Sequence, residues 1–189
     1  MDTNTKTGKF LSTKQIAIGG VLLALMIGSQ FFKNLSVYIT GPIVNVVLVI
    51  VTLTLGLVMG IIFSIIAPIT AFLITGSPVV AAAPHLMIPA IALGNIIMCV
   101  CVYLFYKHMK NKLGLPIGLV VGSVLKALFM GAVISNFILP KFCTNLPEKA
   151  IAVAQKTFSV TQLFTALIAS AVVILIWIPA GKYLLRESK

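Results

Sequence analysis

Residues 42–76 read PIVNVVLVIVTLTLGLVMGIIFSIIAPITAFLITG and contain no charged side chain. As a single α-helix, about 35 residues that each rise about 1.5 Å would extend over roughly 50 Å. The hydrocarbon core of a bilayer is only about 30 Å thick. The stretch is therefore predicted to form a tight helical hairpin, hinged near Gly56 and Gly60, whose two arms both cross a membrane.

The rest of the chain has the same apolar character. Of its 189 residues 60% are hydrophobic and 9% are charged, and the mean hydropathy is +1.15. Soluble domains carry roughly 25% charged residues, so the composition excludes a soluble globular protein, a nucleic-acid binder and a disordered segment. We predict an all-α integral membrane protein with a single transmembrane domain over residues 1–189. Its predicted spans cover residues 14–32, 42–58, 60–76, 84–106, 115–139 and 159–182.

The basic residues predict how these spans are oriented. With six spans, one side of the membrane holds Lys6, Lys9, Lys14, Lys107, Lys110, Lys112, Lys182, Arg186 and Lys189. The other side holds only Lys33, Lys141, Lys149 and Lys156. With five spans the division would be nearly equal. Because cytoplasmic segments of membrane proteins carry an excess of Lys and Arg, we expect six transmembrane helices with both termini cytoplasmic.

The acidic residues exclude several kinds of function. There are three, Asp2, Glu148 and Glu187, and none lies within an apolar run. Ion-driven transporters usually keep an acidic residue inside the membrane, so a self-powered transporter is disfavoured, as is an intramembrane aspartyl hydrolase. The two histidines and three cysteines do not have the spacing of a metal site. We therefore expect no catalytic residue, no metal and no cofactor, and we predict that the protein is not an enzyme.

Lys126 is the most informative polar residue. It lies in GLVVGSVLKALFMGAVISNF (118–137), near the middle of the fifth predicted span. A lysine at that depth costs about 2.5–3.5 kcal/mol on insertion scales. It could snorkel to the interface, bond to backbone carbonyls or to Ser123, or face a polar cavity and pair with an anionic group of a substrate. Gly118, Gly122 and Lys126 recur every four residues, so a thin stripe of accessible backbone leads to the lysine.

Further polar side chains gather near the outer half of the predicted spans. Each alone is consistent with helix capping or an interhelical hydrogen bond, and one of them, His85, follows Pro84 in a predicted loop. As a set they predict a pocket that opens to the outside and is lined by donors and acceptors. The predicted substrate-binding residues are Lys126, Asn95, His85, Asn136, Tyr38, Asn45 and Gln162.

The first span carries a stripe of small residues. In AIGGVLLALMIGSQ, Gly20, Ala24 and Gly28 recur every four residues, and Ala17 lies one turn before Gly20. Such a stripe lets another helix approach the backbone closely. It either packs inside the protein's own bundle or forms a docking face for a partner subunit.

Several of these features together resemble one known family. They are the six spans with both ends inside, the small-residue stripe of the first span, the lack of energising residues, and the segments ITGPIVN (39–45) and PAIALGN (89–95). With them the chain resembles the S component, the substrate-binding membrane subunit, of energy-coupling factor (ECF) vitamin transporters.

The resemblance implies a function, a location and partners. An S component sits in the bacterial cell membrane and binds one water-soluble vitamin or related micronutrient from outside. The fourth to sixth spans and the outer loops would form its site. The small-residue face of the first span would dock on the T component, which carries two ATPase subunits. ATP hydrolysis by those partners would make the S component topple in the membrane and release its cargo inside.

The residues also limit the cargo. Lys126 and the lack of acidic groups predict an anionic or neutral substrate, because cations favour carboxylates and aromatic cages; thiamine is disfavoured. A carboxylated vitamin such as pantothenate, niacin, biotin, lipoate or a folate fits best, while riboflavin and a queuosine-type precursor stay open. Two other functions also stay open: a solo facilitator or channel, and a structural or assembly subunit of a membrane complex.

Overall fold

The computed structural model describes residues 12–32, 36–109 and 113–187, and within these ranges the regular structure is entirely helical. The predicted all-α class is therefore confirmed. The elements are α1 (Thr13–Gln30), α2 (Val37–Leu55), α3 (Leu57–Thr75), α4 (Pro78–Ala82), α5 (Pro84–His108), α6 (Gly114–Met130), η1 (Gly131–Ile138), α7 (Leu139–Phe142), α8 (Glu148–Lys156), η2 (Thr157–Thr161) and α9 (Gln162–Glu187). The two η elements are π-helices. Among the basic residues counted above, Lys6, Lys9, Lys33, Lys110, Lys112 and Lys189 lie outside the described ranges.

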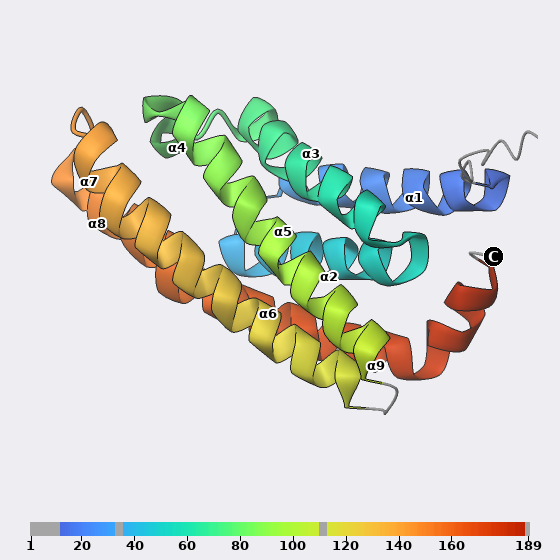
Figure 1. Ribbon diagram of the computed structural model, residues 1–189. Helices are drawn as coiled ribbons and strands as arrows, with labels where there is room; N and C mark the ends of the chain where they lie inside the picture. The colour runs from blue at the N-terminus through green and yellow to red at the C-terminus, as the bar shows by residue number, and fades with distance from the viewer. Residues whose placement is uncertain (1–11, 33–35, 110–112, 188–189) are drawn as a thin grey trace, which may run out of the picture.

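Helix α2 lies at the centre of the bundle, in contact with α1, α3, α5 and α9 (Figure 1). Most of its second half is buried, from Val47 to Thr54. Helices α5 and α6 form an extensive pair on one side, and α9 packs on both α2 and α6. The start of α1, the end of α5 and the end of α9 lie at one end of the bundle, whereas α4, α7 and α8 lie at the other (Figure 1).

Five helical stretches are long and apolar enough to cross a membrane. They are Val37–Leu55, Leu57–Thr75, Pro84–His108, Gly114–Phe142 and Glu148–Gly181. The last two are continuous helices that include the π-helical turns, so the final helix begins before the predicted span at 159–182. Helix α1 is shorter, with 18 residues, and is polar at both ends, at Lys14 and Gln15 and again at Gln30. The fold is thus that of a multi-pass helical membrane protein.

The predicted hinge of the 42–76 hairpin is confirmed at Gly56. This glycine separates α2 from α3 with a φ of 93°, a conformation that side-chain-bearing residues rarely adopt. Gly60 has a different role, because a Cβ there would collide with the Thr52 side chain. One glycine therefore makes the turn, and the other lets the two arms lie close together.

The segment before the fourth predicted span is more helical than expected. Its residues 78–82 form the short helix α4, and His85, which we expected in a loop, lies in the first turn of α5. Proline at the first position of a helix favours helix formation, because its fixed φ suits the helix and its missing N–H would be unpaired anyway. Pro78 and Pro84 occupy that position in α4 and α5.

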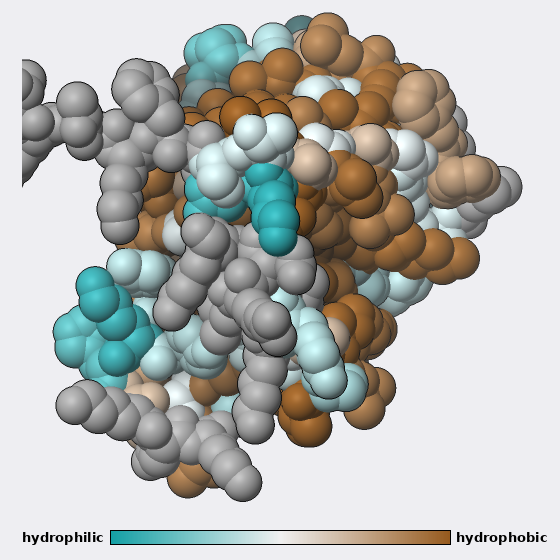
Figure 2. Space-filling model, turned by 90° about the vertical axis from the view of Figure 1, so that its right-hand side faces the viewer, coloured by the Kyte–Doolittle hydropathy of each residue, from teal (hydrophilic) through white to brown (hydrophobic). Residues whose placement is uncertain are grey.

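The outer surface is strongly apolar. Large hydrophobic side chains such as Val21, Leu73 and Ile178 are 70%, 75% and 78% exposed, and they come from α1, α3 and α9. Figure 2 looks onto the end where α1 begins, and there too hydrophobic side chains cover much of the described surface, with hydrophilic ones gathered in patches. A soluble protein rarely exposes apolar surface on this scale, so the exposed sides of α1, α3 and α9 are suited to contact with lipid.

Candidate functional site

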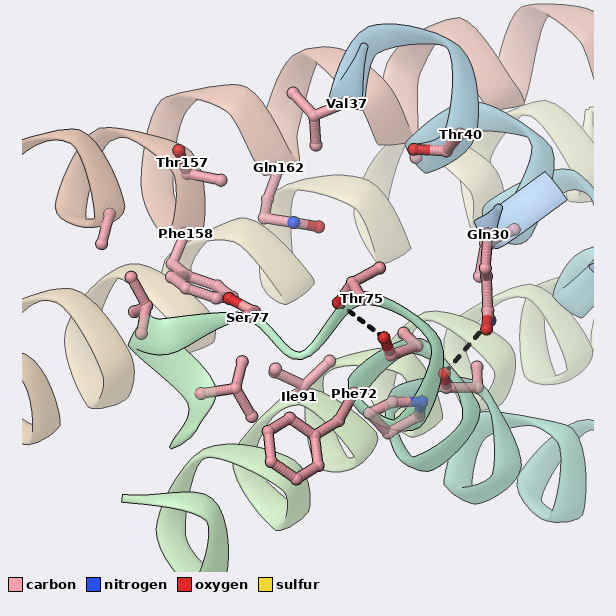
Figure 3. Close-up of a pocket in the computed structure, with 18 of the residues that line it drawn as sticks. Gln30, Val37, Thr40, Phe72, Thr75, Ser77, Ile91, Thr157, Phe158 and Gln162 are labelled. Carbon is pink, nitrogen blue, oxygen red and sulfur yellow. Dashed lines mark hydrogen bonds between the residues drawn. The ribbon is translucent and has the colours of Figure 1, made fainter. Parts of the chain in front are cut away.

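A cavity of about 580 Å³ lies at the α4–α8 end of the bundle. Its walls come from the last residue of α1, the first turns of α2, the second half of α3, and from α4, α5, α6 and the α8–η2–α9 helix. Cavities of roughly 300–1,000 Å³ are typical of small-molecule sites. Figure 3 shows polar side chains from three separate walls, Gln30, Thr75 and Gln162, around this space.

Lys126 lies on the cavity wall and is held by two amides. Its Nζ donates to Asn45 Oδ1 at 2.6 Å and to Asn95 Oδ1 at 2.8 Å, and the side chain is 3% exposed. The three residues come from α6, α2 and α5, so the group ties three helices together. A lysine ammonium has three N–H donors, which leaves one N–H for a group bound in the cavity.

The alternative partner of Lys126 in the sequence was Ser123. Its hydroxyl instead donates to Leu119 O at 2.7 Å and lies 3.1 Å from Ser170 Oγ. The first bond lies within α6, and the second contact links α6 to α9. The lysine is therefore oriented by Asn45 and Asn95 and not by its neighbour on the same helix.

The chemistry of the cavity favours negative charge. No Asp or Glu of the described chain lines it, whereas two lysines do, Lys126 deep in the bundle and the exposed Lys149 on α8. Most of the remaining wall is apolar, with Phe72, Ile91 and Phe158 among its larger side chains. Within such low-dielectric walls, hydrogen bonds to a charged group are stronger than in water. The arrangement can bind a small anionic molecule that has an apolar part.

The α8–η2–α9 helix forms one wall, and the π-helical turn shapes it. Residues Thr157 and Phe158 of η2 and the following Gln162 all line the cavity (Figure 3). Two reciprocal bonds fix this wall against η1: Ser135 Oγ donates to Gln155 O at 2.9 Å, and Gln155 Nε2 donates to Ser135 O at 3.0 Å. π-helical turns occur often at functional sites.

Four of the seven residues predicted for substrate binding meet at this cavity: Lys126, Asn45, Asn95 and Gln162. The other three lie elsewhere. Tyr38 is 53% exposed near the start of α2, and His85 and Asn136 are exposed on α5 and η1. None of these three lines the cavity.

Sequence reasoning missed several residues of the cavity wall. They include Gln30, Thr40, Thr75, Thr157 and Lys149. A polar residue near the end of a span ordinarily reaches water at the interface, so its chemistry alone did not separate these side chains from solvated ones. Burial does separate Gln30, which is only 2% exposed.

The small-residue stripe of α1 faces away from the bundle. Ala17, Gly20 and Ala24 are exposed, and a Cβ on Gly20 or Gly28 would meet no atom within 4 Å. The neighbouring Gly19 instead packs inward, against Leu55. Of the two interpretations of the stripe, packing inside the bundle is thus not the arrangement found here.

The cysteines and histidines form no metal centre. Within the described residues no group of three or more His, Cys, Asp or Glu side chains is placed to hold a metal ion. All three cysteines are free thiols, and Cys143 is buried in an apolar cluster with Met130 and Ala154. Burial raises the pKa of the Cys143 thiol above its ordinary value.

Comparison with known families gives one match. A family model described as "ECF transporter, substrate-specific component" matches residues 14–179. This range contains the cavity, the Lys126 group and the α1 stripe. Searches of curated proteins and of solved structures find no match.

Proposed function

The chain belongs to the family of substrate-specific components of ECF transporters, and from this premise we propose that it captures a small, water-soluble, carboxylated vitamin or precursor from outside the cell. As a member of that family it is a substrate-binding subunit of a membrane transporter and not an enzyme. In this proposal, a T component and two ATPase subunits drive delivery of the cargo to the cytoplasm, and the bacterial cell membrane is the site of action.

The observation that carries the cargo class is the environment of Lys126. Its ammonium bonds only neutral amide oxygens, and none of the described residues that line the cavity carries a carboxylate. A buried cation without a counter-ion is costly, and a carboxylate on the cargo would supply that charge through the remaining N–H of Nζ. Asn45 and Asn95 orient the ammonium, while Gln162 and Thr157, which also line the cavity, are candidates for further polar contacts with the cargo.

The proposal includes the orientation of the protein. Six spans with both termini cytoplasmic direct the cavity end, with α4 and α8, to the outside of the cell. The start of α1 and the end of α9 lie together at the opposite end (Figure 1), which supports this arrangement. The cavity would then take up its cargo from outside.

The test is thermal unfolding in detergent with pantothenate, niacin, biotin, lipoate and folate. A ligand at about 100 times its dissociation constant adds roughly 2.7 kcal/mol to the stability of the folded state, so binding raises the unfolding temperature. Lys126→Met should abolish the shift, whereas Lys156→Met, which removes an exposed lysine of α8 outside the cavity wall, should retain it. An unchanged shift in Lys126→Met would remove the lysine from the site.

The exposed α1 stripe is proposed as the docking face for the T component. A tryptophan at Ala24 would fill the thin part of this face and prevent close helix contact. Ala24→Trp should therefore bind the vitamin normally but fail to co-purify with the T component or to support uptake. Leu175→Trp on the exposed face of α9 is the matched control. Normal assembly of Ala24→Trp would place the docking face elsewhere.

The alternative of an assembly subunit gains less support. Such a subunit would use the α1 stripe but has no need for a cavity with an amide-bound lysine. Loss of complex formation with retained ligand binding in Ala24→Trp would separate the two functions, because an assembly subunit has no ligand-binding activity to retain.

A further inference from the structure

Gln30 ends α1 and contributes to the cavity wall. Its Nε2 donates to Ala67 O of α3 at 3.2 Å, the bond drawn in Figure 3. Its Oε1 has no hydrogen-bond partner, and it is the one buried side-chain nitrogen or oxygen of the described residues in this condition. Buried polar atoms are nearly always paired, so the unpaired oxygen calls for an explanation.

The orientation of the amide is determined by its surroundings. Rotating the amide by 180° would place Oε1 against Ala67 O, and two acceptors would then face each other. The N–H end of the amide therefore stays on Ala67, and the carbonyl end of this cavity-lining side chain is left without a donor. With the side chain 2% exposed, bulk water does not supply the missing donor.

We propose that Gln30 Oε1 accepts a hydrogen bond from an N–H or O–H group of the bound cargo and thereby selects cargo that carries such a donor. The inference rests on the proposed function of the cavity and deepens it. Lys126, on α6, would bind the anionic group, and Gln30, on α1, would bind the donor. The apolar side chains Phe72 and Ile91 would contact the part of the cargo between the two groups.

This pairing determines which compounds the site rejects. A site built to hydrogen-bond a polar group discriminates strongly against an analogue without it, because the buried partner is left unpaired. Biotin and lipoate form an informative pair of probes. Both carry a carboxylate on a four-methylene chain attached to a sulfur-containing ring, but only biotin has N–H donors at the far end. A carboxylate alone would therefore not be sufficient for tight binding.

The variant Gln30→Met tests the role of the acceptor. Methionine has a similar size and no acceptor oxygen, so the cargo donor would lose its partner, and the affinity should fall about ten-fold. Ser29→Ala is the matched control. Ser29 is its buried neighbour on α1, its hydroxyl donates to Met26 O at 2.7 Å, and it lies outside the cavity wall. A merely structural role of Gln30 would lower the unfolding temperature of the empty protein and leave the affinity unchanged.

The probe is the small-molecule fraction of yeast extract, passed over the immobilised full-length protein, with retained compounds identified by mass spectrometry. The expected result is retention of a compound with both an anionic group and an N–H or O–H donor. Lys126→Met should lose it, Gln30→Met should bind it about ten-fold more weakly, and Ser29→Ala should bind it normally. A derivative of the same compound methylated at the donor should bind wild type and Gln30→Met equally weakly.

Two outcomes would overturn the inference in different ways. If Lys126→Met loses the compound but Gln30→Met binds it as wild type does, Gln30 does not contact the cargo and the proposed function stands. If wild type retains no compound that Lys126→Met fails to retain, the proposed function itself is contradicted, and the role of Gln30 is contradicted with it.

Discussion

Helix α6 packs on α5 differently in its two halves, although the same four-residue spacing runs along both. In the first half the positions are glycines, and a Cβ on Gly118 would lie 2.9 Å from Phe105 Cβ and 3.2 Å from Val102 Cα. In the second half the next position is Lys126, whose side chain extends to Asn45 and Asn95. The same four-residue spacing therefore packs α6 tightly against α5 at one end of the bundle and places Lys126 on the cavity wall at the other.

The difference depends on where the missing side chain lies. In the first half of α6, the glycines at the contact with α5 are Gly118 and Gly122 of α6 itself. Beside Lys126, the glycine at the contact is Gly94 of α5. A Cβ on Gly94 would lie 2.8 Å from Met130 Cγ and 3.8 Å from Lys126 Cγ. Long side chains of α6 therefore occupy the space above α5 at this level, and Asn95, the residue after Gly94, reaches the ammonium.

The largest loss of stability is expected at Gly118, where the backbones of α5 and α6 lie close together. Gly118→Leu places a side chain against Phe105 Cβ and the Val102 main chain, neither of which can move without separating α5 from α6. Overpacking of this kind costs about 1–3 kcal/mol or more, and at about 2–4 °C per kcal/mol the unfolding temperature in detergent should fall by several degrees. The affinity of the remaining folded protein for its ligand should stay within about two-fold.

The matched control is Val120→Leu on the same helix. Val120 is 51% exposed, so the added methylene contacts lipid or detergent and should leave the unfolding temperature unchanged. If Gly118→Leu were as stable as wild type, α5 and α6 would be packed more loosely at Gly118 than the contact distances indicate. The first half of α6 would then not be more tightly packed than the second.

A smaller effect is expected at the other glycine. In Gly94→Ala the new Cβ meets the flexible end of Met130, at Cγ and Sδ, and methionine adapts easily to such changes. Alanine also favours a helix over glycine by about 0.5–1 kcal/mol, so the unfolding temperature should change little. Ligand affinity should fall a few-fold instead, because Met130 and Lys126 share the space above Gly94. If Gly94→Ala instead lost much stability and kept its affinity, the second half of α6 would, like the first, serve packing and not ligand binding.

The sequence predicted the helix type and the hinge because both depend on local properties. The uncharged stretch 42–76 is too long to cross the bilayer once as a single helix, so it had to form a hairpin. Gly56 was a residue that could adopt the backbone conformation of the turn. Lys126 was found because a lysine in the middle of a span is costly wherever it points. These inferences needed no knowledge of which helices are neighbours.

The arrangement of the site was beyond the sequence because it depends on packing between distant segments. Asn45 and Asn95 were candidates, but their shared bond to Lys126 requires the registers of α2, α5 and α6 together. Tyr38 and His85 looked equivalent to them and proved to lie on the exposed surface. Gln30 was not among the predicted residues and is buried at the cavity wall, and the apolar pattern held no sign of the π-helical turns.

The smallest effect concerns the apolar cluster around Cys143, at the same end of the bundle as the cavity. It tests whether this cluster is closed to solvent although the cavity is open. Cys143 is buried there, in an apolar cluster with Met130 and Ala154, and burial raises its pKa. Because the thiolate is the reactive form, N-ethylmaleimide should modify Cys143 more slowly in the folded protein than in denaturant, with a rate that still rises as the pH increases toward the raised pKa. Peptide-level mass spectrometry separates Cys143 from the other two cysteines. If Cys143 reacted in the folded protein as fast as in denaturant, the cluster would be open to solvent. The cavity end of the bundle would then lack a tightly packed layer like the α5–α6 contact at Gly118.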